Sequence, residues 1–395
     1  MKLLLDLGAT SIKCALIDNN QLVVTRSIPS PSRKNYSTTP DQYTIPASVF
    51  KFRIETLLDS MTDEPIDAVY ICSEMHGCVC DDTYISWKDS RADIKSLDAD
   101  NFFNITGMKL RTGIAYASLM ATDLTNPKVG TLMDTFLQGQ VKTNITMAAA
   151  MGLVDKNTNN YSDELIKDFQ LNSISTDLSD VIGYVNINNK QVPAYAGIGD
   201  LQSALVGAGI GVTADAVLNL GTGSQVACVA DNIDGEEIRP MPDGSRVKVI
   251  THIPCGRALN ILAAQFGEDR FWTAWELLTA EQVLAADYNQ AQLSFFESAW
   301  QYGPNSGFVK FKEGQTFTDL IAAIAHRWVT QYITALTLLD PDSKVKTVAL
   351  SGGVSHKSKF IIPVLEHYSR RKFFSTDTIT GEETLDGLLK ICNND

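Results

Sequence analysis

Residues 3–11 read LLLDLGATS, and residues 216–224 read AVLNLGTGS. Each segment is an apolar run followed by a glycine-containing turn with hydroxyl side chains, and each continues into a second β-type run, at Ile12–Ile17 and Gln225–Ala230. A single copy of this pattern is common in any β-hairpin. Two copies, about half a chain apart, predict instead a duplicated lobe, with each lobe presenting one hairpin to a shared cleft.

Length and composition favour two globular lobes. The chain has 395 residues, which is more than one hydrophobic core usually supports. Hydrophobic residues make up 44% and charged residues 20%, a balance typical of globular proteins. We therefore predict an N-terminal lobe over residues 1–207 and a C-terminal lobe over residues 208–395.

Charge and cysteine content narrow the class of protein. The formal net charge of −13 argues against a nucleic-acid partner or an anionic membrane surface, although a local pocket can still hold phosphates. The apolar run Leu3–Leu5 is too short for a signal peptide or a membrane span. The seven cysteines lack the spacing of a disulfide framework, so we expect reduced thiols and a cytoplasmic location. The sequence leaves the oligomeric state open, with a homodimer among the alternatives.

The residue types of the two hairpin turns suit a nucleotide phosphate. Gly8, Gly221 and Gly223 let the backbone approach a phosphate, so that consecutive N–H groups point at its oxygens. Lys13 adds a positive charge if its side chain faces the ligand rather than solvent. Asp6 ends the first strand, where a carboxylate can hold a hydrated Mg²⁺ beside the phosphates of ATP. The hydroxyl groups that can add donors are those of Thr10, Ser11, Thr222 and Ser224.

A third glycine-rich turn follows the long helical pattern of Phe317–Leu339. Lys346–Leu350 predicts a strand, Gly352 and Gly353 come next, and a helix is expected from about Ser355. Strand, glycine pair and helix start predict a nucleotide contact where only backbone fits. The alternative is a tight turn in which Ser355 only caps the helix.

Asp200 is the candidate catalytic group. It follows the glycine-rich stretch Gly197–Gly199 and precedes Ser203–Gly209, a run of small residues with helical character. An aspartate at a helix start often does no more than cap the helix. Its position between the two hairpin segments favours a further role at the cleft, as the base that accepts a proton from a ligand hydroxyl.

A second polar group lies between Tyr84 and Arg91. Trp87 offers an aromatic face for the C–H face of a sugar, while Asp89 and Arg91 can fix hydroxyl groups by charge-assisted hydrogen bonds. The alternative for this stretch is a surface turn with one ion pair.

These motifs, in this order, resemble those of the FGGY carbohydrate kinase family. The likeness runs nearly end to end, from residues 6–13, which resemble the first phosphate motif, to Glu382–Ile391, which resembles the closing helix. The motifs between them are Met75-His76-Gly77, Trp87-x-Asp89-x-Arg91, Gly199-Asp200, Gly221-Thr222-Gly223-Ser224 and Ser351-Gly352-Gly353. The resemblance implies an α/β, two-lobed actin-like ATPase (ribonuclease H-like) fold, with mixed sheets flanked by helices and a central nucleotide cleft.

The resemblance also implies an activity and a set of roles. The expected reaction is ATP-dependent phosphorylation of a ketose sugar at a primary hydroxyl, with Mg²⁺ at Asp6, Asp200 as the base, and an adenosine-binding turn at Gly352 and Gly353. The expected sugar-binding residues are Glu74, Met75, His76, Trp87, Asp89, Arg91 and Gln202.

Within the family, the sequence looks most like sedoheptulokinases, with xylulose or ribulose kinases as the alternative. Two features depart from the family pattern: Glu74 stands where many members have Gln, and the Lys-Trp part of a family signature is absent from Gly113–Pro127. A non-catalytic sugar-sensing relative and a chaperone-like, nucleotide-gated ATPase remain as alternatives from other functional classes.

Overall fold

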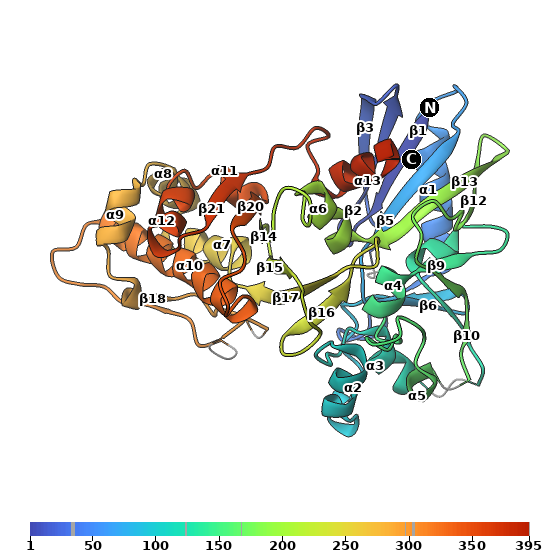
Figure 1. Ribbon diagram of the computed structural model, residues 1–395, viewed down its shortest axis with the longest axis horizontal. Helices are drawn as coiled ribbons and strands as arrows, with labels where there is room; N and C mark the ends of the chain where they lie inside the picture. Colours follow the sequence, from blue (N-terminus) through green and yellow to red (C-terminus); the bar gives the residue numbers. More distant parts are fainter. Residues whose placement is uncertain (33–35, 123–124, 167, 297, 302–304, 395) are drawn as a thin grey trace. The chain divides into compact units, whose positions relative to one another are not determined.

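The computed structural model describes residues 1–32, 36–122, 125–166, 168–296, 298–301 and 305–394 (Figure 1). The chain divides into two compact units. Unit 1 comprises Met1–Gly207, Asp231–Val247 and Thr378–Asp395, and unit 2 comprises Ala208–Ala230 and Lys248–Asp377. Among the described residues, no helix combines the length and the apolar character that crossing a membrane requires.

The predicted boundary at 207/208 coincides with the first break between the units, but two later segments assigned to the C-terminal lobe pack in unit 1. One of them carries helix α13 (Glu383–Asn394), which the sequence had indicated as a closing helix. Its buried residues Leu385, Leu388 and Leu389 join Leu4 and Ile198 in one apolar cluster. The apolar face of this helix is therefore buried against the first sheet rather than in unit 2.

The main sheet of unit 1 has six strands in the order β12-β13-β5-β1-β2-β3. Strand β1 pairs antiparallel with β2, as the first hairpin predicted, and parallel with β5, which in turn pairs parallel with β13. The three central strands therefore end at the same edge of the sheet. Their bounds are β1 Lys2–Leu7, β2 Ser11–Asp18, β3 Gln21–Pro29, β5 Ala68–Ser73, β12 Gly183–Ile187 and β13 Lys190–Gly199.

A second, five-stranded sheet of unit 1 follows the order β10-β8-β6-β7-β4, and β9 pairs with β11. The strands of this sheet and this pair are β4 Thr44–Pro46, β6 Cys78–Cys80, β7 Thr83–Ile85, β8 Lys128–Gly130, β9 Lys142–Asn144, β10 Gln170–Leu171 and β11 Ser173–Ser175. The segment Asp231–Val247 of unit 1 also contains β16 Glu237–Pro240, which belongs to neither and stands next to β17 in the strand order of a six-stranded sheet. The helices are α1 Ala47–Asp59, α2 Ala99–Thr106, α3 Ala115–Met120, α4 Ile145–Ala150, α5 Asp163–Ile166 and α6 Asp200–Gly207, with 3₁₀ turns at Ile94–Ser96 and Leu132–Thr135.

Unit 2 repeats the strand arrangement of unit 1. Its hairpin β14–β15 is antiparallel, β14 pairs parallel with β20, and β20 pairs parallel with β21. The order β17-β15-β14-β20-β21 thus matches β3-β2-β1-β5-β13, which confirms the predicted duplication. The bounds are β14 Ala216–Leu220, β15 Ser224–Val229, β17 Arg246–Ile253, β20 Thr347–Ser351 and β21 Lys372–Ser375, with a small pair β18 Ala291–Gln292 and β19 Phe308–Val309.

The core of unit 2 is built around α10 (Phe317–Leu339). Thr316 caps this helix and forms a capping box with Asp319, which fixes where the helix begins. The indole of Trp328 packs edge-on against that of Trp275, with ring centroids 5.3 Å apart, and both side chains are fully buried. The other helical segments are α7 Gly256–Phe266, α8 Glu268–Glu276, α9 Ala280–Ala285, α11 Gly353–His356, α12 Ile361–Tyr368 and a 3₁₀ turn at Tyr288–Gln290.

Candidate active site

The carboxyl ends of β1, β5 and β13 gather the candidate residues of unit 1 at one sheet edge. In the register of the sheet, Leu7 and Gly199 both lie opposite Ser73. The residues that follow these strands therefore emerge side by side, and the Glu74 amide donates to the Leu7 carbonyl at 2.9 Å. In open α/β sheets, this edge is where ligands bind.

A bulge in β13 directs the end of that strand. The pairing with β5 shifts between Ala196 and Ile198, and both Ala196 and Gly197 have positive φ values, 65° and 61°. A left-handed alanine is unfavourable, and such backbone is often found where a functional group must be aimed. The bulge leads directly to Gly199 and Asp200.

Asp200 is the first residue of α6, and its Oδ1 accepts a hydrogen bond from the Leu201 amide at 2.8 Å. Burial, together with the negative charges of Asp6 and Glu74, raises the pKa of Asp200 to about 7. A carboxyl group with a pKa close to neutrality can both take up and release a proton at cellular pH, which is what a general base requires.

Asp6 is buried near the end of β1, and two side chains from distant segments hold it. The Thr384 hydroxyl donates to its Oδ2 at 2.7 Å, and the Cys72 thiol lies 3.6 Å from its Oδ1. Burial raises the pKa of Asp6, so this site disfavours a carboxylate that has no counter-charge. A bound cation would offset the cost of burying the negative charge of Asp6.

The residues present fit Mg²⁺ held partly by a nucleotide. Within the described ranges, no group of three or more His, Cys, Asp or Glu side chains could cage an ion. Mg²⁺ normally binds through one or two carboxylates and substrate phosphates, so Asp6 alone is a sufficient protein ligand. Lys13 pairs with Glu382 at 2.5 Å, and its role as a phosphate contact stays a prediction.

Glu74 is buried and accepts two hydrogen bonds. Tyr84 donates to Oε1 at 2.7 Å and the Trp87 indole N–H donates to Oε2 at 2.8 Å. Burial nevertheless raises the pKa of Glu74. Trp87 is 42% exposed, so Glu74 fixes the orientation of an indole that solvent can still reach, and Lys88 Nζ lies 5.4 Å from the centre of its ring.

Met75, His76 and Gln202 lie close to the end of β13. A Cβ atom on Gly199 would approach Met75 Sδ to 2.4 Å and Gln202 Oε1 to 2.5 Å, so these two side chains lie directly against the end of β13. His76 Nδ1 donates to the Ala150 carbonyl at 2.9 Å, which leaves its Nε2 as an acceptor. Burial, aided by the charge of Arg239, lowers the pKa of His76 to about 4, so the imidazole is neutral.

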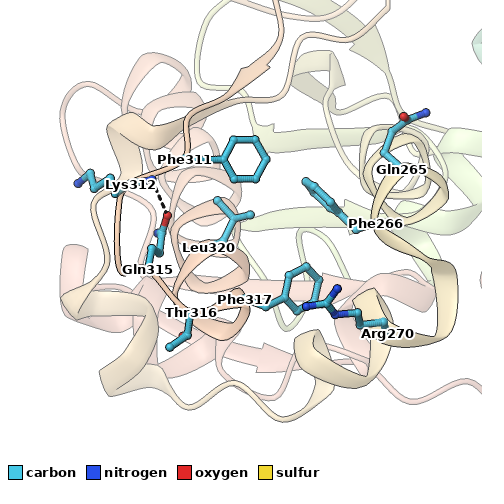
Figure 2. A pocket seen from close by; sticks show the side chains of 9 residues that line it. All are labelled: Gln265, Phe266, Arg270, Phe311, Lys312, Gln315, Thr316, Phe317 and Leu320. Carbon is cyan, nitrogen blue, oxygen red and sulfur yellow. Dashed lines mark hydrogen bonds between the residues drawn. The ribbon is translucent and has the colours of Figure 1, made fainter.

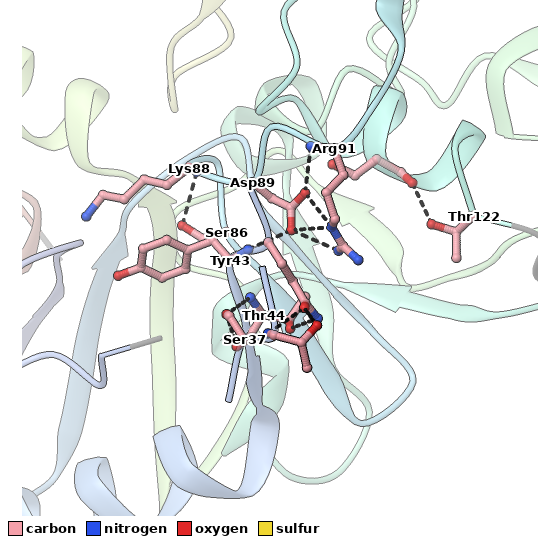
Figure 3. Close-up of polar contacts among 11 residues, drawn as sticks. Ser37, Tyr43, Thr44, Ser86, Lys88, Asp89, Arg91 and Thr122 are labelled. Atoms are coloured by element: carbon pink, nitrogen blue, oxygen red, sulfur yellow. Dashed lines mark hydrogen bonds and ion pairs between the residues drawn. The ribbon is translucent and has the colours of Figure 1, made fainter. Parts of the chain in front are cut away.

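Asp89 and Arg91 brace a loop, as Figure 3 shows. Asp89 Oδ2 accepts from the Tyr43 amide at 2.8 Å, and both oxygens accept from Arg91 Nε at 3.0 Å. These contacts are those of the ion-paired turn that the sequence left as the alternative. The role of Asp89 and Arg91 in sugar binding stays a prediction.

Unit 2 has a pocket of about 360 Å³ that combines two of the glycine turns. Gly352 has a φ of 96°, and a Cβ there would lie 2.4 Å from the Leu220 carbonyl, which makes this position strictly glycine. Three lining residues, Asn260, Trp272 and Lys357, were not predicted from the sequence. They lie far apart along the chain and form no recognisable motif. The lining residues are Gly221, Thr222, Gly256, Asn260, Trp272, Gly353, Val354 and Lys357.

The hydroxyl-bearing residues of the two hairpin turns differ in their surroundings. Ser224 is buried and its hydroxyl donates to the Asn219 carbonyl at 2.7 Å, so it closes the turn. Thr10 is exposed, Ser11 is half-buried, and the Gly8 amide donates to the Ser11 carbonyl at 3.1 Å. A Cβ on Gly223 would meet open space.

The sequence matches no family model and no curated protein. The fold is similar to a xylulose kinase from Lactobacillus acidophilus, with a TM-score of 0.80, 17% identity, and coverage of 100% of this chain and 90% of that chain. It is also similar to a gluconate kinase from Lactobacillus acidophilus, with a TM-score of 0.78, 17% identity, and coverage of 100% of this chain and 90% of that chain. A third similar structure is Plasmodium falciparum glycerol kinase with ADP, with a TM-score of 0.75, 15% identity, and coverage of 99% of this chain and 89% of that chain. The expected α/β fold with mixed sheets flanked by helices is thereby confirmed.

Proposed function

We propose that this chain is an ATP-dependent sugar kinase in which Asp200 accepts the proton of a sugar hydroxyl. The observation that carries the proposal is the carboxyl group of Asp200, with a pKa of about 7, at the sheet edge where Asp6 and Glu74 also emerge. Because a fold alone does not define a function, the argument rests on this site rather than on the structural neighbours.

In the proposed reaction, the hydroxyl oxygen bonds to the γ-phosphorus of ATP as its proton passes to Asp200. The bond from γ-phosphorus to the bridging oxygen breaks, and ADP leaves with the electron pair. Positioning and charge stabilisation provide most of the catalysis in phosphoryl transfer. Mg²⁺, when bound, would neutralise phosphate charge, and Asp6 is the residue that would hold it.

The proposed nucleotide site is the pocket of unit 2, whose volume of about 360 Å³ falls in the range of small-ligand sites. Gly221, Thr222 and Gly353 line it, so two predicted ATP-binding turns meet there. The ring of Trp272 lies 5.0 Å from Lys357 Nζ and offers an apolar wall for a base. That Gly8, Thr10 and Ser11 of the first hairpin bind phosphate stays a separate prediction.

The proposed substrate is a ketose, phosphorylated at a primary hydroxyl. Sedoheptulose, giving sedoheptulose 7-phosphate, follows from the sequence resemblance, and a pentulose such as xylulose is the second candidate. Xylulose kinases among the structural neighbours favour the pentulose as much as the sequence favours the longer sugar. Trp87, Met75 and His76 would contact the sugar in either case.

A coupled ADP-release assay over a panel of ketoses tests the proposal. We expect ADP release that depends on both Mg²⁺ and one of the sugars. Sugar-independent ATPase activity would favour a chaperone-like, nucleotide-gated protein, and sugar binding without turnover would favour a sensor. Either result would refute the kinase assignment. Sedimentation of the same preparation would decide whether the chain is a monomer or a homodimer.

A further inference from the structure

Unit 2 contains a second pocket, of about 390 Å³, that shares no lining residue with the proposed nucleotide site. Figure 2 shows the nine side chains that line it. They come from the end of α7, the first turn of α8, the segment between β19 and α10, and the first turn of α10. A cavity of this volume can hold a small molecule.

The walls of this pocket are largely aromatic. The ring of Phe266 meets the rings of Phe311 and Phe317 edge to face, with centroid distances of 6.3 and 5.9 Å. Figure 2 shows the rings of Phe266 and Phe311 pointing toward one another. Leu320, which is 4% exposed, adds a buried apolar surface. A flat apolar group that packs against these side chains would be removed from water together with them.

Phe311 is held at the rim of the pocket, although its side chain is 71% exposed. The Lys310 amide donates to the Gln290 carbonyl at 2.8 Å, and Gln290 Nε2 donates to the Lys310 carbonyl at 3.1 Å. On the other side of Phe311, Gln315 Nε2 donates to Gln290 Oε1 at 3.2 Å. The segment that carries the ring is therefore fixed before a ligand arrives, which lowers the entropy lost on binding.

Arg270 brings a positive charge to this apolar pocket. Its guanidinium carbon Cζ lies over the Phe317 ring, 3.9 Å from the ring centre. Among the described residues, no carboxylate forms an ion pair with Arg270. A guanidinium that lies over a ring keeps its N–H donors for other groups, and two of them can hold two oxygens of one anion.

The charges around the pocket favour an anionic ligand over a cationic one. None of the nine lining residues is acidic. Lys312 also lines the pocket, but its ammonium pairs with Asp287 at 3.0 Å and points away from the rings in Figure 2. Aromatic rings can attract a cation, but here Arg270 already covers Phe317 and would repel a second positive charge.

We propose that this pocket binds a small molecule that joins a flat apolar ring to one anionic group, such as a carboxylate, sulfonate or phosphate. The ring would pack against Phe266 and Phe311, and the anion would accept hydrogen bonds from Arg270. The site goes beyond the proposed sugar phosphorylation, which uses no residue of this pocket. Binding here is therefore independent of the proposed kinase activity.

Anilinonaphthalene sulfonate is the probe, because it joins flat aromatic rings to one anion and fluoresces when it binds an apolar site. Phenylnaphthylamine has the same rings without the sulfonate. We expect Arg270→Gln to weaken binding of the anionic probe by ~10-fold or more and binding of the neutral probe by less than ~2-fold. Lys310→Gln is the matched control, because Lys310 Nζ also lies over a ring, 4.8 Å from the centre of Phe308, and Lys310 is not a lining residue.

Phe311→Ser should weaken the binding of both probes by ~5-fold or more, because one wall of the pocket is lost. Phe52→Ser is its control, since Phe52 in α1 is 72% exposed, against 71% for Phe311. Both side chains are exposed, so neither change should lower the melting temperature, and lost binding reports on the pocket rather than on the fold. Inorganic phosphate, which has the charge without the ring, should not displace the anionic probe, whereas naphthoate should.

The same titrations with ADP present separate this pocket from the nucleotide site. Probe binding that persists with ADP and falls in Arg270→Gln and Phe311→Ser supports the proposal, even if no sugar releases ADP and the kinase proposal fails. Absence of probe binding, equal binding by the wild type and both variants, or complete displacement by ADP overturns it and leaves the kinase proposal intact. Self-association of the wild type that Phe311→Ser abolishes would assign the pocket to a second copy of the chain and would also overturn it.

Discussion

Replacing Asp200 by Asn should stabilise the protein at alkaline pH and not at acidic pH. The pKa of this carboxyl is about 7 in the folded protein, against an ordinary value of 3.8. Between these values the folded state binds the proton and the unfolded state does not, so stability is lost as pH rises through this window. Three pKa units correspond to at most about 4 kcal/mol, the full penalty above about pH 7. Asparagine resembles the protonated acid and avoids that penalty.

Urea unfolding of the wild type and of Asp200→Asn at about pH 4.5 and about pH 8 measures this difference in the free energy of unfolding. The contributions of all other titrating groups are the same in the two proteins and therefore cancel. We expect the free energy of unfolding of Asp200→Asn to exceed that of the wild type by up to about 4 kcal/mol at the higher pH and to differ little at the lower pH. Asp319→Asn is a control of opposite sign, since the Thr316 contacts lower the pKa of Asp319. A gain for Asp200→Asn that is equal at both pH values would refute the reasoning.

Three further predictions follow from the site. Asp200→Asn should retain sugar and ATP binding but lose turnover by ~10²-fold or more, and near-normal turnover would remove Asp200 as the base. Glu74→Leu should raise the sugar KM and change Trp87 fluorescence, because the indole N–H loses its acceptor, whereas Glu74→Gln keeps one acceptor oxygen and should have a smaller effect. Gly352→Ala should weaken ADP binding and cost about 1–3 kcal/mol in the free energy of unfolding, because its Cβ would strike the Leu220 backbone. Gly314→Ala, at a positive φ of 75° but in open space, controls for backbone strain, and equal effects of the two variants would argue against the close approach.

The sequence was sufficient for features that local patterns encode. The two hairpins, the long helix Phe317–Leu339 and the glycine turn at Gly352 all appear where alternation, periodicity and turn chemistry predicted them. Asp200 could be singled out because a glycine-rich turn precedes a helix. Alternation, periodicity and turn chemistry depend only on residues that are neighbours in the sequence, so they can be recognised without the tertiary structure.

Contacts between segments that lie far apart along the chain could not be predicted from the sequence. Lys13 pairs with Glu382 and Thr384 holds Asp6, although both partners lie near the other end of the chain. The Ser224 hydroxyl donates to the Asn219 carbonyl within its own turn, a contact that the sequence pattern did not indicate. Arg239, whose charge helps to lower the pKa of His76, gave no signal, because these two residues lie far apart in the sequence and approach only in the folded protein. Pairing of this kind depends on topology, which residue patterns do not encode.

The packing of α13 on α6 has a consequence for how the protein is made. A Cβ on Gly387 would lie 1.9 Å from the Ser203 carbonyl, so the two helices meet backbone to backbone, and the Ser203 hydroxyl donates to the Thr384 carbonyl at 2.7 Å. Because the first strand and the last helix share one apolar cluster, the first unit to leave the ribosome is the last to be completed. The apolar surface around Leu4 therefore lacks its cover of Leu385, Leu388 and Leu389 until the segment that forms α13 has been synthesised.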